Sequence, residues 1–104
     1  VLVTPAVMLQ VARLYMRQGC MNRAKALLSN PETWEGTAGE ILLLQLEKAS
    51  LLSFTQLSFK QAIAQAEEAI ASLEAQISPA EKAEARRIHI RILLTAAIYW
   101  EVPQ

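Results

Sequence analysis

Apolar residues recur with the period of an amphipathic helix between residues 59 and 77. The steps between them are three and four positions, and the charged and amide residues fall on the opposite side. This spacing turns one apolar stripe toward a core and leaves the other face in solvent. The predicted stripe comprises Phe59, Ile63, Ala66, Ile70, Leu73 and Ile77.

Two other segments are apolar on most sides. Residues 41–54 are interrupted mainly by Gln45, Glu47 and Lys48, and residues 92–100 carry no charge at all. A helix that is apolar all round is buried, so the first segment predicts a central helix and the second a helix that needs cover. No segment alternates with period two for long enough to form a strand. The pattern predicts an all-α fold.

Capping residues predict where five helices begin and end. Thr4-Pro5 opens a helix that runs to about residue 18 and stops at Gly19, and a short helix follows over residues 22–29. A Thr-x-x-Glu capping box at residues 37–40 opens a helix over 38–54, and a weaker Ser-x-x-Gln box at 53–56 opens the next, to residue 77. Ser78-Pro79 and Glu81 open the last, which reaches Glu101.

Composition bounds the chemistry. The 104 residues fit one domain, and a net charge of zero argues against a nucleic-acid partner. There is no Asp, one His and one Cys, so a Ser-His-Asp triad and an internal disulfide are impossible. We predict that His89 lies on the wet side of its helix beside Arg87 and Arg91, and that Cys20 is a packing residue. The spacing of these groups matches no structural metal site. We therefore expect no enzyme activity, no cofactor and no metal.

The uncharged stretches are too short to span a bilayer. The longest are residues 1–12 and 49–59, against the roughly 18–20 residues a transmembrane helix needs. The first apolar run leads directly into Arg13 and Arg17 and lacks the basic start of a signal peptide. We expect a cytoplasmic protein with no membrane partner. The chain does not begin with methionine, which is what we expect of an excerpt from a longer protein.

The neutral total conceals segregated charge. Residues 1–31 hold four basic and no acidic residues, residues 32–84 hold nine glutamates and three lysines, and residues 85–104 hold three arginines and one glutamate. Either the helices complement one another within the fold, or a groove has one basic end that orients an acidic partner segment. The charges alone leave both open.

Two stretches of the sequence match each other, which indicates an internal repeat. Ala12 and Tyr15 match Ala96 and Tyr99 at an offset of 84 residues, or two units of about 42, and apolar residues match at 8/92, 9/93 and 14/98. The spacing of Ala12, Tyr15, Gly19, Ala24 and Leu28 resembles the tetratricopeptide repeat family, as does the run Phe59, Ala62, Ala66 and Ala69. Residues 50 and 53 are serines where the family has a small residue and a tyrosine.

The resemblance implies stacked antiparallel helical hairpins in one domain over 1–104, about two and a half repeats. They are repeat one over about 5–31, repeat two over about 38–77, and an unpaired helix over about 79–101. It also implies a groove lined by the first helix of each unit. Carried over by phase, the lining comprises Leu9, Arg13, Met16 and Arg17, then Leu44, Glu47, Leu51 and Phe54, and then Ile90, Leu93 and Trp100. Core packing competes for Leu44 and Leu51.

Such a module binds an apolar helical or extended segment of another protein, without catalysis. The groove lacks the asparagines of the family's carboxylate clamps, so a chaperone-tail receptor is disfavoured. The chain also resembles small type III secretion co-chaperones that cover a needle-subunit helix, and a structural segment of a long solenoid scaffold. A generic five-helix bundle is the remaining alternative. The apolar last helix predicts a homodimer or a hetero-complex.

Overall fold

The computed structural model describes residues 4–30, 34–55 and 59–101, without the side chains of residues 54–55 and 99–101. The described residues form α1 (Pro5–Arg17), α2 (Met21–Leu27), α3 (Ala38–Thr55), α4 (Phe59–Leu73) and α5 (Pro79–Glu101), with a one-turn 3₁₀-helix, η2 (Glu74–Gln76), after α4. No described residue lies in a strand. The prediction of an all-α fold with five α-helices is confirmed.

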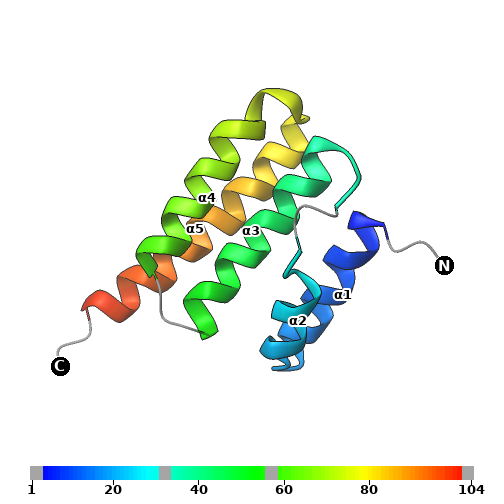
Figure 1. The fold of residues 1–104 in the computed structure, drawn as a ribbon. Coiled ribbons are helices and arrows are strands. Elements are labelled where there is room, and N and C mark those ends of the chain that lie inside the picture. Colours follow the sequence, from blue (N-terminus) through cyan, green and yellow to red (C-terminus); the bar gives the residue numbers. More distant parts are fainter. Residues whose placement is uncertain (1–3, 31–33, 56–58, 102–104) are drawn as a thin grey trace.

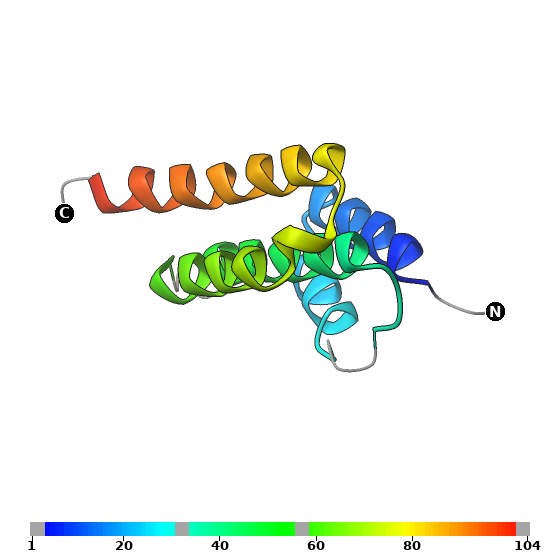
Figure 2. The same ribbon diagram turned by 90° about the horizontal axis from the view of Figure 1, so that it is seen from above.

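The helices stack as hairpins around α3. Contacts join α1 to α2 and α3 to α4, and α3 also packs against α1, α2 and α5, while α5 packs against both α3 and α4. The helices α3, α4 and α5 run in alternating directions (Figure 1). Figure 2 shows α5 along one side of the α3–α4 pair, with α1 and α2 toward one end of it. The central position predicted for residues 41–54 is therefore confirmed.

Local capping explains three of the helix starts. The Thr4 hydroxyl accepts a hydrogen bond from the Val7 amide at 3.3 Å. Thr37 and Glu40 bond each other's backbone amides at 3.2 and 3.0 Å, and Ser78 and Glu81 do the same at 3.3 and 3.0 Å. Each bond satisfies an amide that has no partner within the helix. These three predicted starts are confirmed.

Gly19 ends α1 as predicted. Its φ is +79°, a left-handed conformation that a glycine adopts at low cost. The Cys20 amide then donates to the Tyr15 carbonyl at 2.8 Å, and the chain turns into α2. The helix α2 begins at Met21, one residue before the predicted start, and its cap residue Cys20 makes no side-chain capping bond.

The predicted capping box at residues 53–56 is wrong. Ser53 lies inside α3, which continues to Thr55, and only 1% of its surface is exposed. Its hydroxyl has no hydrogen-bond partner in the described structure. Gln56, the other half of the box, lies outside the described residues. A Ser-x-x-Gln pattern caps a helix only where a helix begins at the serine. Here burial of α3 among its neighbours favours a helix that continues through Ser53.

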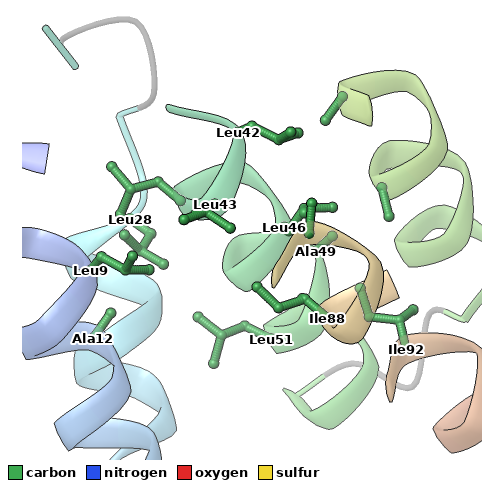
Figure 3. Packing of buried hydrophobic residues seen from close by; sticks show 14 of the residues in the cluster. Leu9, Ala12, Leu28, Leu42, Leu43, Leu46, Ala49, Leu51, Ile88 and Ile92 are labelled. Carbon is green, nitrogen blue, oxygen red and sulfur yellow. The ribbon is translucent and has the colours of Figure 1, made fainter. Parts of the chain in front are cut away.

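The core forms where small residues let helices approach and leucines fill the space between them. Ala12 and Ala24 are completely buried at the start of the stack, as are Ala62 and Ala66 on α4. Figure 3 shows the leucines of α3 reaching toward α1 on one side and toward α5 on the other. Trp34, in the loop before α3, is 7% exposed and joins the same cluster. The echoed alanines, Ala12 and Ala96, are both buried.

Candidate functional site

A hollow of about 360 Å³ lies where α1, α3 and α5 converge. We call it the arginine hollow, because four of its eight lining residues are arginines. Two more are glutamates and two are apolar. The lining comprises Arg13, Met16 and Arg17 from α1, Glu47 from α3, and Glu84, Arg87, Ile88 and Arg91 from α5.

Helical spacing explains why these residues meet. Arg13, Met16 and Arg17 stand three and four positions apart and share one face of α1. The four lining residues of α5 follow the same spacing, at 84, 87, 88 and 91. The helix α3 lies between and contacts both, and it contributes a single side chain, Glu47. The hollow is therefore a product of three helix faces rather than of one motif.

The floor of the hollow is a buried carboxylate. Glu47 is 1% exposed, and its Oε1 accepts a hydrogen bond from Arg91 Nη2 at 2.6 Å. Its Oε2 lies 3.8 Å from Arg13 Nε. Burying a carboxylate is unfavourable unless it is paired and hydrogen-bonded. Glu47 therefore draws one arginine from α1 and one from α5 toward α3.

Two further contacts complete the network. Arg13 Nη2 donates to Glu84 Oε1 at 2.7 Å, which links α1 directly to α5. Arg91 Nη2 also lies 3.5 Å from the buried Ser50 hydroxyl. Serine stands at position 50 where the tetratricopeptide pattern has a small residue, and this contact with Arg91 gives its hydroxyl a partner.

The remaining two arginines of the hollow have no counter-charge among the described side chains. Arg17 and Arg87 are exposed, and neither forms an ion pair or side-chain hydrogen bond with a described residue. The two glutamates of the hollow are already engaged by Arg13 and Arg91. The hollow thus carries excess positive charge, and its free guanidinium groups are those of Arg17 and Arg87.

The structure divides the predicted groove residues into four groups. Arg13, Met16, Arg17 and Glu47 come together around the arginine hollow. Ile90 and Leu93 are 50% and 39% exposed on α5, but they do not line it. The side chains of Phe54 and Trp100 lie outside the described residues.

Three predicted groove residues belong to the core instead. Leu9 is 7% exposed, Leu44 is completely buried and Leu51 is 1% exposed. Their side chains pack among the neighbouring helices, so a partner of the folded chain has no access to them. For Leu44 and Leu51 this is the packing alternative that the sequence left open.

Sequence reasoning missed four lining residues, Glu84, Arg87, Ile88 and Arg91. The available signal was the run of charged residues at helical spacing on one face of α5. The prediction for His89 is wrong, since it does not share that face. Its side chain is 22% exposed and turns toward α4, where Nε2 lies 4.0 Å from Glu67 Oε1, beyond hydrogen-bond distance. Residues two positions apart on a helix point in different directions.

A second hollow, of about 350 Å³, lies between α3 and α4. Its walls mix apolar residues with one lysine, one glutamate and two glutamines, so it lacks the charge excess of the arginine hollow. The lining comprises Ile41, Gln45, Lys48, Gln65, Glu68, Ala69, Ser72 and Leu73.

Within the described part of the chain, no three His, Cys, Asp or Glu side chains are grouped so that they could hold a metal ion. Over the same residues no helix combines the length and the apolar character needed to cross a membrane. Comparison with family models, with curated proteins and with solved structures found no match to this chain.

Proposed function

We propose that this chain is a non-catalytic interaction module that binds an acidic segment of another protein at the arginine hollow. The observation that carries the proposal is the pair of exposed arginines without a counter-charge among the described side chains, Arg17 and Arg87, beside two arginines held by Glu47 and Glu84. A guanidinium group forms paired, charge-assisted hydrogen bonds with a carboxylate. Two free guanidinium groups at one hollow favour a ligand with more than one carboxylate.

The network around Glu47 supports a preformed site. Arg13 is tied to Glu84 of α5 at 2.7 Å, and Arg91 is tied to Glu47 of α3 at 2.6 Å. A site held in place before binding avoids part of the entropy cost of ordering its side chains. The stacking order of the hairpins supports the tetratricopeptide-like arrangement that the sequence resembles, in which the first helix of each repeat lines one binding face.

Other classes of function have less support. The hollow is lined by arginine, glutamate, methionine and isoleucine, and so offers no hydroxyl, thiol or imidazole to act as a nucleophile. Its glutamates are engaged in ion pairs rather than aimed at a ligand. A nucleic-acid partner would meet the nine glutamates of residues 32–84 as well as the arginines, and a chain with no net charge lacks the basic footprint such partners need.

A binding assay with model peptides tests the proposal. A fluorescein-labelled peptide with a cluster of glutamates is titrated with the chain, and anisotropy reports binding, with the all-glutamine analogue as the neutral probe. We expect the acidic peptide alone to bind, and the double variant Arg17→Glu, Arg87→Glu to weaken binding tenfold or more. Both residues are exposed, so the thermal melt stays unchanged. The matched control is Arg23→Glu, an exposed charge reversal on α2 outside the hollow.

Two outcomes contradict the proposal. In one, the double variant binds the acidic peptide as tightly as the unmodified chain. In the other, Arg23→Glu weakens binding as much per residue as the changes at the hollow, which indicates a general attraction to positive charge rather than a site.

A further inference from the structure

The outer face of α5 is apolar and has no cover. Ile90, Leu94 and Ile98 are 50%, 58% and 63% exposed, although isoleucine and leucine side chains are usually buried. They stand four residues apart and therefore form one stripe along the helix. In Figure 2 this half of α5 extends away from α1 and α2. The stripe is separate from the buried face of α5, which carries Ala85, Ile88, Ile92 and Ala96.

The stripe begins at the arginine hollow. Arg87 and Arg91 line the hollow, and Ile90 and Leu94 each follow one of them by three residues on the same side of α5. From Arg87 to Ile98 is eleven residues, or about 16 Å of helix at 1.5 Å per residue. A positively charged hollow thus continues into an apolar face, from Ile90 to Ile98, that is about two helical turns long.

We infer that the arginine hollow and the apolar face of α5 form one two-part site for an amphipathic helix of a partner protein. Acidic side chains at one end of that helix bind Arg17 and Arg87, and its apolar side chains cover Ile90, Leu94 and Ile98. This inference rests on the proposed function, because it takes the acidic segment bound at the hollow as the end of a longer ligand. Arg87 and Leu94 are seven residues apart, so the partner's acidic and apolar groups are separated by about 10 Å.

A partner of different sequence fits this site better than a second copy of the chain. Among the described residues, large apolar side chains are exposed on α1 and α5 only. The helix α1 offers Val7 and Leu14 but contains no acidic residue. On α5, Glu84 is paired with Arg13 and Glu81 caps its own helix, and the side chain of Glu101 lies outside the described residues. Among the described side chains, no helix of this chain therefore presents free acidic groups beside a large apolar stripe.

The exposed acidic face of α4 leads to the same conclusion. Glu67 and Glu68 are exposed there and Glu74 is exposed in η2, and alanines and glutamines surround them. Such a face can approach the arginines of a second copy, but it has nothing to bury the apolar stripe. Charge complementarity and apolar cover are met together only by an amphipathic segment in which both are present.

Three synthetic peptides of about 16 residues test the inference by fluorescence anisotropy with the intact chain. The first has two glutamates in its first turn and leucines seven and eleven residues further on. The second replaces the leucines with alanine, and the third replaces the glutamates with glutamine. We expect the first to bind at least tenfold more tightly than the second, since only the first covers the stripe.

A pair of charge substitutions tests whether the tighter binding of the first peptide depends on the apolar stripe of α5. The double variant Leu94→Glu, Ile98→Glu is expected to bind the first peptide no more tightly than the second. The matched control is Val7→Glu, Leu14→Glu on α1, where both side chains are apolar and exposed but belong to a different helix from the stripe, and it leaves the tenfold difference intact. Circular dichroism checks that each variant is folded, and the comparison of peptides on the unmodified chain needs no variant.

Each outcome decides between explanations. If the first two peptides bind equally, the apolar face is not part of the site, and the proposed function at the hollow stands alone. If neither acidic peptide binds better than the glutamine peptide, the proposed function fails and this inference with it. Light scattering after size exclusion measures the oligomeric state of the chain. If the chain is a dimer and the variant Leu94→Glu, Ile98→Glu is a monomer, a second copy covers the stripe, and this result overturns the inference.

Discussion

Replacing the buried carboxylate at the floor of the arginine hollow is expected to destabilise the fold. Glu47→Gln keeps the volume and one acceptor oxygen but removes the charge. With the remaining oxygen at the Oε1 position, 2.6 Å from Arg91 Nη2, the new amide nitrogen replaces Oε2 and points its two N–H donors toward Arg13 Nε, 3.8 Å away. One oxygen still accepts from Arg91, whereas the amide nitrogen faces another donor.

The size of the effect follows from these contacts. A hydrogen bond to a charged group contributes about 1.5–3 kcal/mol, against about 0.5–1.5 kcal/mol for a neutral one. The loss is partly offset because no charge remains to be desolvated. The Arg13 and Arg91 side chains are 26% and 48% exposed, so water reaches both and the cost stays below that of breaking a fully buried pair. We expect a loss of about 1–2 kcal/mol in the free energy of unfolding.

Urea unfolding followed by circular dichroism measures this difference. For a domain of this size each kcal/mol lowers Tm by roughly 4–8 °C, so thermal melts give an independent reading. The matched control is Glu68→Gln, the same change on the exposed face of α4 where no ion pair forms with a described residue. The control is expected to stay within about 0.5 kcal/mol. If Glu47→Gln is as stable as the unmodified chain or more stable, the reasoning is refuted. The free-energy cost of burying the carboxylate would then equal or exceed the stabilisation from its contacts with the arginines.

Three other substitutions test the packing and the helix ends, each by urea unfolding. Leu46→Ala removes a completely buried side chain and is expected to lower the free energy of unfolding by about 2–5 kcal/mol. Its control Leu94→Ala, at a position 58% exposed, lowers it by at most about 0.5 kcal/mol. A large loss of stability at Leu94 would mean that its face is covered in solution. Ser78→Ala removes the cap of α5 and costs about 0.5–2 kcal/mol, while the exposed Ser72→Ala is neutral; equal effects would contradict the capping role. Gly19→Ala forces a left-handed alanine at φ +79° and costs about 1–2 kcal/mol, and an unchanged stability would show that the turn rearranges freely.

Helix starts were predictable because the forces that set them act over three residues. Thr4, Thr37 and Ser78 each form a hydrogen bond with a residue three positions further on. The prediction at Ser53 failed because it used only this short range, and a similar pattern of residues can also occur within a helix. What decided it was burial against neighbouring helices, which leaves Ser53 1% exposed and which no short window of sequence contains.

The candidate site was predictable in part. The resemblance to the tetratricopeptide repeat family, carried over by helix phase, placed Arg13, Arg17 and Glu47 in one groove, since residues three and four apart on a helix share a face. The same phase argument put Leu44 and Leu51 in the groove, where the structure buries them. An apolar residue on a central helix fits either environment, and only the positions of the neighbouring helices distinguish a groove from a core.

The amino-acid sequence by itself determined the all-α fold, the main helix starts and the segregation of charge. These depend on periodicity and on contacts between near neighbours. Only the tertiary structure decided where the charges meet. Arg13 and Glu84 are 71 residues apart and Glu47 and Arg91 are 44 apart, so their contacts exist only after α1 and α5 have packed against α3. The physical reason is that a buried carboxylate needs its counter-charges within a few ångströms, and helix packing sets that distance.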